Sequence, residues 1–136
     1  MTSSTNLFLI TGTDESEIDT RARRTVRELA GEDPDPFALD TVEETDETGP
    51  REALGQLLSS LASPPFLGNQ KTIWLRRFSA FSQVKKEGPL GKTVQALQEK
   101  VEAGIPADTN LVLSGPGLDK RKKLYQVIES QGRVIV

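Results

Sequence analysis

Short apolar runs alternate with longer segments of helical periodicity along almost the whole chain. A short, unbroken apolar run closed by glycine or a charged residue is typical of a strand buried on both faces of a parallel sheet. Five such strands are expected, over 6–12, 37–42, 72–75, 109–114 and 133–136. Acidic residues crowd the second of these runs, whereas the other four contain none.

The segments between the strands repeat apolar residues at the spacing of an amphipathic helix. We expect helices over 16–30, 51–62, 92–103 and 119–130, the last one capped by Asp119. Thr13-Asp14-Glu15-Ser16 offers capping groups and early acids for the first helix, and Gly31 ends it. The 76–89 segment is polar and loop-like, with Phe78 and Phe81 as expected anchors in the core.

Strands that alternate with helices predict an α/β fold. The expected architecture is a mostly parallel five-stranded sheet with helices on both faces. Many unrelated functions share this class, so the fold alone assigns none. A chain that stops on a strand, without a closing helix, is expected to be part of something longer.

The composition removes several kinds of chemistry. The 136 residues include no cysteine and no histidine, which excludes thiol nucleophiles, disulfides, Cys/His zinc sites and imidazole bases. A net charge of −3 argues against a basic nucleic-acid surface over the whole domain. We find no membrane-length apolar run and no signal-peptide pattern, and the lack of disulfides fits the cytoplasm.

The loop after the first strand is the usual ligand site of this fold class. In 12–16, one glycine is accompanied by the carboxylates of Asp14 and Glu15, which repel phosphate, and no general base or metal-ligand set is paired with them. Gly91-Lys92-Thr93 lacks the earlier glycine of a phosphate loop, because position 86 is lysine, and we expect a glycine turn before a helix. A nucleotide-binding or phospho-switch domain that uses 12–16 remains the alternative function.

Two charged segments stand out. The 32–47 segment carries eight acids and no base, as expected of a solvated loop. Lys120, Arg121, Lys122 and Lys123 open the last predicted helix, where the macrodipole disfavours cations. That cluster is either a solvated first turn or a contact for an acidic partner or for the nucleic-acid backbone.

The 63–70 segment, Ser-Pro-Pro-Phe-Leu-Gly-Asn-Gln, lies between a predicted helix and a predicted strand. Pro64 and Pro65 fix φ and remove two backbone donors, so both elements must stop there. Phe66 and Leu67 then stand on a short, stiff connection. Such an apolar pair is either a lid on the core or a contact for a partner, and physical reasoning alone favours neither.

Three segments together resemble the DNA polymerase III delta-subunit family. They are the opening Leu-Phe-Leu-Ile-Thr-Gly-Thr-Asp at 7–14, the leucine-rich helix, apolar loop and following strand at 57–75, and Leu-Asp-Lys-Arg-Lys-Lys-Leu-Tyr at 118–125. The three fall in the family's order and cover nearly the whole chain. Two features depart from the family: many members have leucine before phenylalanine where this chain has Phe66 before Leu67, and the family's lid and collar domains are absent.

The resemblance implies that 1–136 is the N-terminal domain of a clamp-loader delta subunit, with the fold of a first AAA+ ATPase domain but a degenerate phosphate loop. Such a domain has no catalytic residue, cofactor or metal ion of its own. It binds the sliding clamp (the beta subunit) through Pro64, Pro65, Phe66 and Leu67 and helps to open it. The other implied partners are the remaining clamp-loader subunits and, through the complex, DNA, all in the cytoplasm.

Overall fold

The predicted alternation of strands and helices is present in the computed structural model, which describes residues 6–34, 36, 38–63, 65, 70–79, 81, 88–118 and 120–136. The strands within these ranges are β1 (Leu7–Ile10), β2 (Leu39–Glu43), β3 (Lys71–Arg76), β4 (Thr109–Ser114) and β5 (Arg133–Ile135). The helices are α1 (Glu15–Ala30), α2 (Pro50–Ala62), α3 (Pro89–Ala103) and α4 (Lys123–Gln131).

The strands form one sheet in the order β2-β3-β4-β1-β5, and every neighbouring pair is parallel. The predicted α/β class and parallel five-stranded sheet are therefore confirmed. The chain crosses from β1 to the far edge strand β2, returns through β3 to β4, and then passes β1 to reach β5. The carboxyl ends of all these strands consequently lie together, along what we call the carboxyl edge of the sheet. Their amino ends lie along the opposite side, the amino edge.

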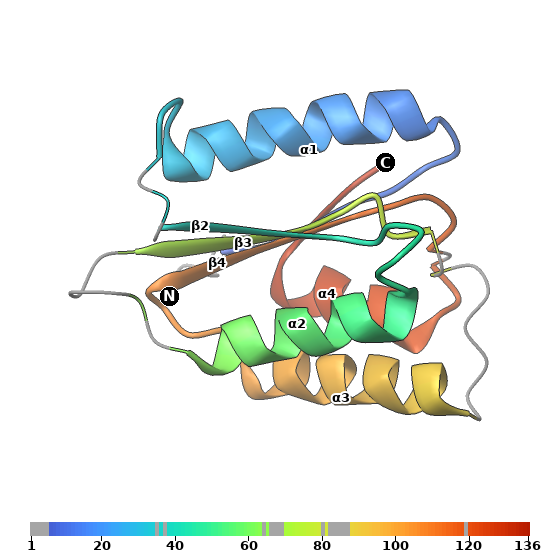
Figure 1. Ribbon diagram of the computed structural model, residues 1–136. Helices are drawn as coiled ribbons and strands as arrows, with labels where there is room; N and C mark the ends of the chain where they lie inside the picture. The colour runs from blue at the N-terminus through green and yellow to red at the C-terminus, as the bar shows by residue number, and fades with distance from the viewer. Residues whose placement is uncertain are drawn as a thin grey trace.

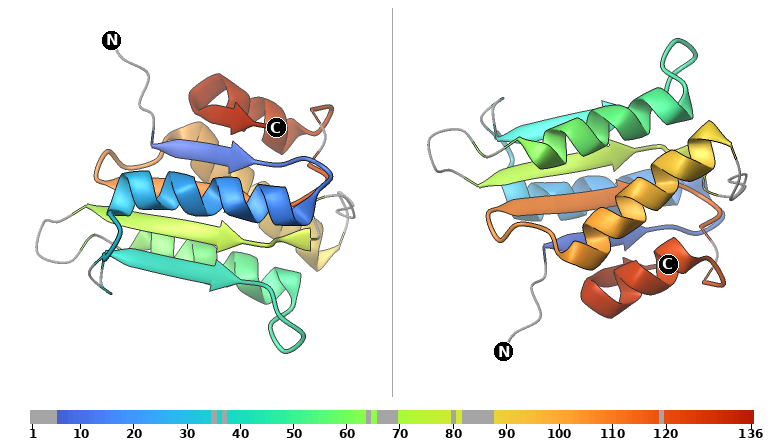
Figure 2. Two further views of the ribbon diagram at one scale, coloured as in Figure 1. Left: turned by 90° about the horizontal axis from the view of Figure 1, so that it is seen from above. Right: turned by 90° about the horizontal axis from the view of Figure 1, so that it is seen from below.

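Helices cover both faces of the sheet, as expected. Figure 1 shows α1 alone on one side and α2, α3 and α4 on the other. The two views of Figure 2 show α1 lying along the middle strands, and on the opposite face α2 near β2 and β3 with α4 beside β1.

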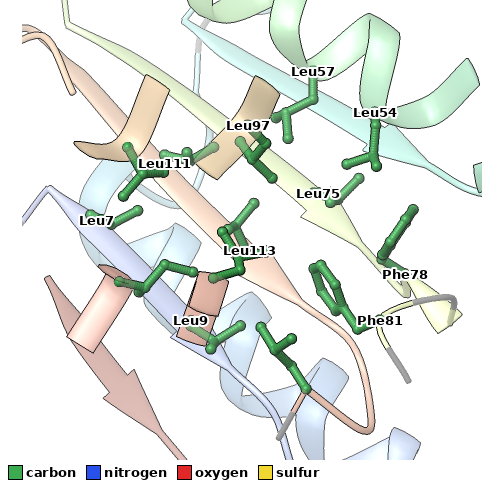
Figure 3. Close-up of a cluster of buried hydrophobic side chains, with 14 of the residues drawn as sticks. Leu7, Leu9, Leu54, Leu57, Leu75, Phe78, Phe81, Leu97, Leu111 and Leu113 are labelled. Atoms are coloured by element: carbon green, nitrogen blue, oxygen red, sulfur yellow. The ribbon is translucent and has the colours of Figure 1, made fainter. Parts of the chain in front are cut away.

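Two apolar clusters hold these layers together. The smaller one joins α1 to the sheet through Ile18, Ala22, Val26 and Trp74. The larger one, drawn in Figure 3, fills the space between the sheet and the other three helices with closely packed leucines. Phe78 and Phe81, fully buried after β3, add an edge-to-face pair with ring centroids 4.6 Å apart and confirm the two predicted anchors.

Three local predictions differ from the structure. α4 begins at Lys123 with Lys122 as its N-cap, later than predicted, and the predicted cap Asp119 lies outside the described residues. Gly91-Lys92-Thr93 lies inside the first turns of α3 and forms no separate turn, because that helix starts at Pro89, a residue suited to a first helical turn.

The third difference concerns β2. This strand continues past its predicted end to Glu43, which stands opposite Arg76 in the parallel register and forms an ion pair with it. Glu44 accepts hydrogen bonds from the backbone nitrogen and side chain of Ser79. The acidic 32–47 segment is therefore only partly a solvated loop.

Candidate partner-binding site at the connection between α2 and β3

The segment predicted to bind a partner connects α2 to β3 at the amino edge of the sheet. Pro64, Phe66 and Leu67 lie outside the described residues, and Pro65 is half-buried. The described residues on either side show how the two ends of the connection are held.

The last turn of α2 is closed by a residue of the following strand. Lys71 opens β3 and is only 9% exposed, and its Nζ atom donates to the carbonyl oxygens of Ser60 at 2.8 Å and Ser63 at 3.4 Å. These carbonyls lie at the C-terminal end of a helix, which carries negative partial charge and leaves its last carbonyls short of intrahelical donors. Ser60 O also accepts from the backbone nitrogen of Ser63 at 3.2 Å. A buried ammonium is well suited to this position.

Two further contacts fix the same region to the sheet. Ser60 Oγ donates to Asp40 Oδ2 of β2 at 2.5 Å, so the helix end is joined to the edge strand. The backbone nitrogen of Lys71 donates to Asp108 O, just before β4, at 2.9 Å. Both ends of the connection are therefore held by contacts with β2, with β3 and with the residue just before β4. We call Asp40, Ser60 and Lys71 the loop base.

Sequence reasoning did not identify Lys71 as part of a site. The available signal was a lysine at the start of an otherwise apolar strand, immediately after a helix end. A lysine of this kind either lies at the surface or finds carbonyl acceptors nearby, and here it finds them.

The loop after β1 lies at the opposite edge of the sheet. Asp14 is the N-cap of α1, and its Oδ1 atom accepts from the backbone nitrogens of Ser16 at 3.0 Å and Glu17 at 3.2 Å. In phosphate-binding loops of this fold class such amides hold the anion. Here the protein's own carboxylate occupies them, and Glu15 adds a second negative charge beside them.

A charged cluster near the same edge also escaped sequence reasoning. The Arg76 guanidinium donates to both oxygens of Asp19, with Nε–Oδ1 and Nη2–Oδ2 distances of 2.8 and 2.9 Å, and lies 5.1 Å from the Trp74 ring centroid. Arg23 and Arg77 lie within 3.6 Å of the same carboxylate. The cluster connects α1 to the end of β3. Its arginines are paired with the carboxylate of Asp19, so the cluster has a structural role.

The electrostatics of Asp19 follow from these contacts. The hydrogen bonds from Arg76 hold the pKa of this carboxyl below its ordinary value of 3.8, and the positive charges of Arg76, Arg77 and Arg23 lower it further. Partial burial acts in the opposite direction. The carboxylate is therefore stabilised in its charged form.

The basic cluster predicted at a helix start is present but differently arranged. Lys120, Arg121 and Lys122 lie in the turn before α4, only Lys123 belongs to the helix, and all four side chains are exposed. Arg121, Lys122 and Lys123 line one hollow together. The structure brings none of the four near the loop base, which is built from β2, α2 and β3.

In the described ranges, none of the helices combines the length and apolar character that a bilayer crossing requires. Comparison with curated protein sequences yields no match.

Two solved structures share the fold. A Bacillus subtilis DNA clamp loader delta protein has a TM-score of 0.65 and 17% sequence identity, over 96% of this chain and 37% of its own length. A DNA polymerase III gamma subunit-related protein from Thermotoga maritima has a TM-score of 0.64 and 17% identity, over 98% of this chain and 42% of its own length. The chain thus spans less than half of either protein.

The sequence itself is matched by a family model over residues 8–136, nearly the whole chain, and that model describes the DNA polymerase III delta subunit. The resemblance inferred from three separate segments is therefore confirmed. This chain belongs to the DNA polymerase III delta-subunit family.

Proposed function

We propose that residues 1–136 form the N-terminal domain of a clamp-loader delta subunit, which binds the sliding clamp and helps to open it. Membership in the delta-subunit family supports this assignment, as does the fold shared with a clamp loader delta protein. The domain acts by binding and performs no chemistry. Other clamp-loader subunits are its further partners, DNA is reached through the complex, and the cytoplasmic location expected from the sequence is part of the same proposal.

The proposed contact is the apolar pair Phe66 and Leu67, with Pro64 and Pro65 before it. A large apolar side chain that becomes fully buried contributes about 1.5–3 kcal/mol, which is the scale of an interface hot spot. The prolines restrict the connection before binding and so reduce the entropy lost when it is ordered.

The observation that carries this proposal is the loop base. A buried lysine that ties the end of α2 to the start of β3 holds both ends of the connection in place. Anchored ends favour a segment that presents two side chains to a partner in a defined geometry, because less freedom is lost on binding. The occupied amides after β1 count against the alternative, nucleotide binding.

The test is a titration of the purified chain against its sliding clamp, comparing the wild type with the Phe66→Ala, Leu67→Ala double variant. If the pair is a hot spot, we expect a loss of at least about 2 kcal/mol, roughly a thirtyfold rise in Kd. Val136→Ala is the matched control, since it shortens an exposed apolar side chain (71% exposed) outside this segment. Thermal unfolding of each variant verifies that it is folded.

Each other outcome has a definite meaning. Equal affinity of wild type and double variant would contradict the role of the pair. No wild-type binding to the clamp would contradict the clamp-binding function. A rise in melting temperature on addition of nucleotide would favour the alternative domain type that uses the loop after β1.

A further inference from the structure

A hollow of about 560 Å³ lies between α3 and the turn that leads into α4. This volume falls within the range of pockets that hold small ligands or anchoring side chains, roughly 300–1,000 Å³. The apolar part of its lining comes from both sides of the hollow and consists of Phe81, Val94, Leu118 and Leu124. We call this hollow the α3–α4 groove.

Positive charge is concentrated on one rim of the groove. Arg121, Lys122 and Lys123 line the side of α4, whereas Gln95 and Gln98 line the side of α3. Lys122 and Lys123 are exposed, and neither forms an ion pair with any residue that the structure describes. The rim can therefore accept negative charge without breaking an existing pair of these lysines.

The start of α4 adds a second feature. Lys122 is the N-cap of this nine-residue helix, its side chain makes no capping hydrogen bond, and no acid stands in the first turn of the helix. Cations at a helix N-terminus are unfavourable, whereas a carboxylate there is favoured by the macrodipole and by the lysines together. Among the described residues, the first turn of α4 therefore carries no carboxylate of its own.

We propose that the α3–α4 groove binds an acidic, amphipathic segment of a partner protein. An apolar side chain of that segment fills the hollow over Val94 and Leu118, and its carboxylates lie against Lys122, Lys123 and the amides of α4. This surface does not depend on the proposed clamp contact, because the groove lies at the carboxyl edge of the sheet and the loop base at the amino edge.

The apolar lining distinguishes this partner from nucleic acid. Nucleic-acid backbones are bound by stripes of cations that each contact a phosphate, and affinity then falls steeply with salt. Three rim cations around an apolar hollow, on a chain with net charge −3, fit an acidic peptide with apolar anchors better.

The test uses fluorescence anisotropy with a labelled synthetic helical peptide that carries leucines on one face and glutamates on the other. The comparison probes are the same peptide with serine for leucine, the same peptide with lysine for glutamate, and a short labelled DNA duplex. We expect binding of the leucine–glutamate peptide and much weaker binding of the other three. Amide NMR shifts should change around Val94, Leu118 and Lys123.

Two variants probe the two halves of the site. The Lys122→Gln, Lys123→Gln double variant should weaken binding of the leucine–glutamate peptide roughly three- to tenfold, as expected for two exposed charge pairs. Val94→Ser, at a half-buried lining position, should weaken it as well. The matched control is the Lys92→Gln, Lys100→Gln double variant, which removes two exposed lysines of α3 outside the groove and should leave affinity unchanged.

The proposal would be overturned by any of three results. One is no binding of the leucine–glutamate peptide to the wild type. Another is equal binding by the wild type and the Lys122→Gln, Lys123→Gln variant. The third is tighter binding of the DNA duplex than of the peptide, lost in that same variant, which would make the rim a nucleic-acid surface.

Discussion

Asp19 shows at the scale of one residue how a charge can hold two elements together. Its carboxylate is 14% exposed and receives two hydrogen bonds from Arg76, so α1 is fastened to the end of β3. We expect Asp19→Asn to lower the free energy of unfolding at pH 7 by about 1.5–3 kcal/mol, the range for hydrogen bonds to charged groups. Urea denaturation measures the difference.

The pH dependence follows from the lowered pKa of Asp19. Because the folded-state pKa lies below the ordinary value of 3.8, the stabilisation is complete above that value. It is lost as the pH falls through the folded-state pKa, so wild type and Asp19→Asn should converge in acid. Asp46→Asn, at an exposed acid without an ion pair among the described residues, is the control. An equal gap at all pH values would contradict this account.

Single residues differ in how far the sequence reveals their roles. Phe78 and Phe81 were predicted as core anchors because large aromatic side chains in a polar segment have few other uses. The pairing of Asp19 with Arg76 could not be predicted, since it joins residues 57 positions apart and depends on where α1 crosses the sheet. Tertiary geometry, which periodicity does not encode, decides such contacts.

The end of α2 and the start of β3 act as one element through Lys71. Lys71→Met keeps the length and apolar stem of the side chain but removes the donor to Ser60 and Ser63. We expect a loss of about 1–3 kcal/mol in unfolding free energy, because Ser60 O loses the buried ammonium donor and keeps the weaker hydrogen bond from Ser63 N. Affinity for the clamp should also fall, since the ends of the connection are no longer held; calorimetry of unfolding and clamp titration measure both effects.

Lys71→Arg is the informative companion variant. It keeps a positive donor near the two carbonyls and should recover part of both losses. If Lys71→Met lowers stability yet leaves clamp affinity unchanged while the protein is folded, the loop base has no role in presenting the connection. The role of Phe66 and Leu67 would then be judged by their own variant alone.

Element boundaries were harder to predict than element types. The four helices and five strands found in the described ranges were expected in the right order, because periodicity and glycine stops are local signals. The start of α4 was placed too early, since Asp119 has the chemistry of an N-cap, yet the chain makes a turn through Lys122 before the helix begins. Only part of the candidate site was predictable for a similar reason: Phe66 and Leu67 stand out in sequence, whereas the loop base is assembled from β2, α2 and β3.

At the scale of the whole molecule, the two proposed surfaces lie at opposite edges of one parallel sheet. The connection between α2 and β3 enters the sheet at its amino edge, and the α3–α4 groove lies where α3 and α4 begin, at the carboxyl edge (Figure 1). The packed sheet lies between the two surfaces, so a partner bound at one surface does not contact a partner bound at the other.

We therefore expect a saturating concentration of sliding clamp to change the Kd of the leucine–glutamate peptide by less than about twofold. Two sites without a shared mobile element have little coupling free energy, far below the typical 1–3 kcal/mol of allosteric pairs. The anisotropy titration is repeated with and without clamp, and the Phe66→Ala, Leu67→Ala variant serves as the control. A large loss of peptide affinity that requires wild-type Phe66 and Leu67 would show that the two partners compete.

The outer edge of β2 bears on how copies of this molecule meet one another. β2 is an edge strand of the described sheet, and an unpaired strand edge is a template on which a second chain can add and aggregation can begin. Exposed Asp40 lies in this strand, and a charged side chain on an edge strand discourages such pairing. At high concentration, the β2 strands of different molecules should thus resist pairing edge to edge. Partners then recognise the side chains of the protein and not its backbone edge.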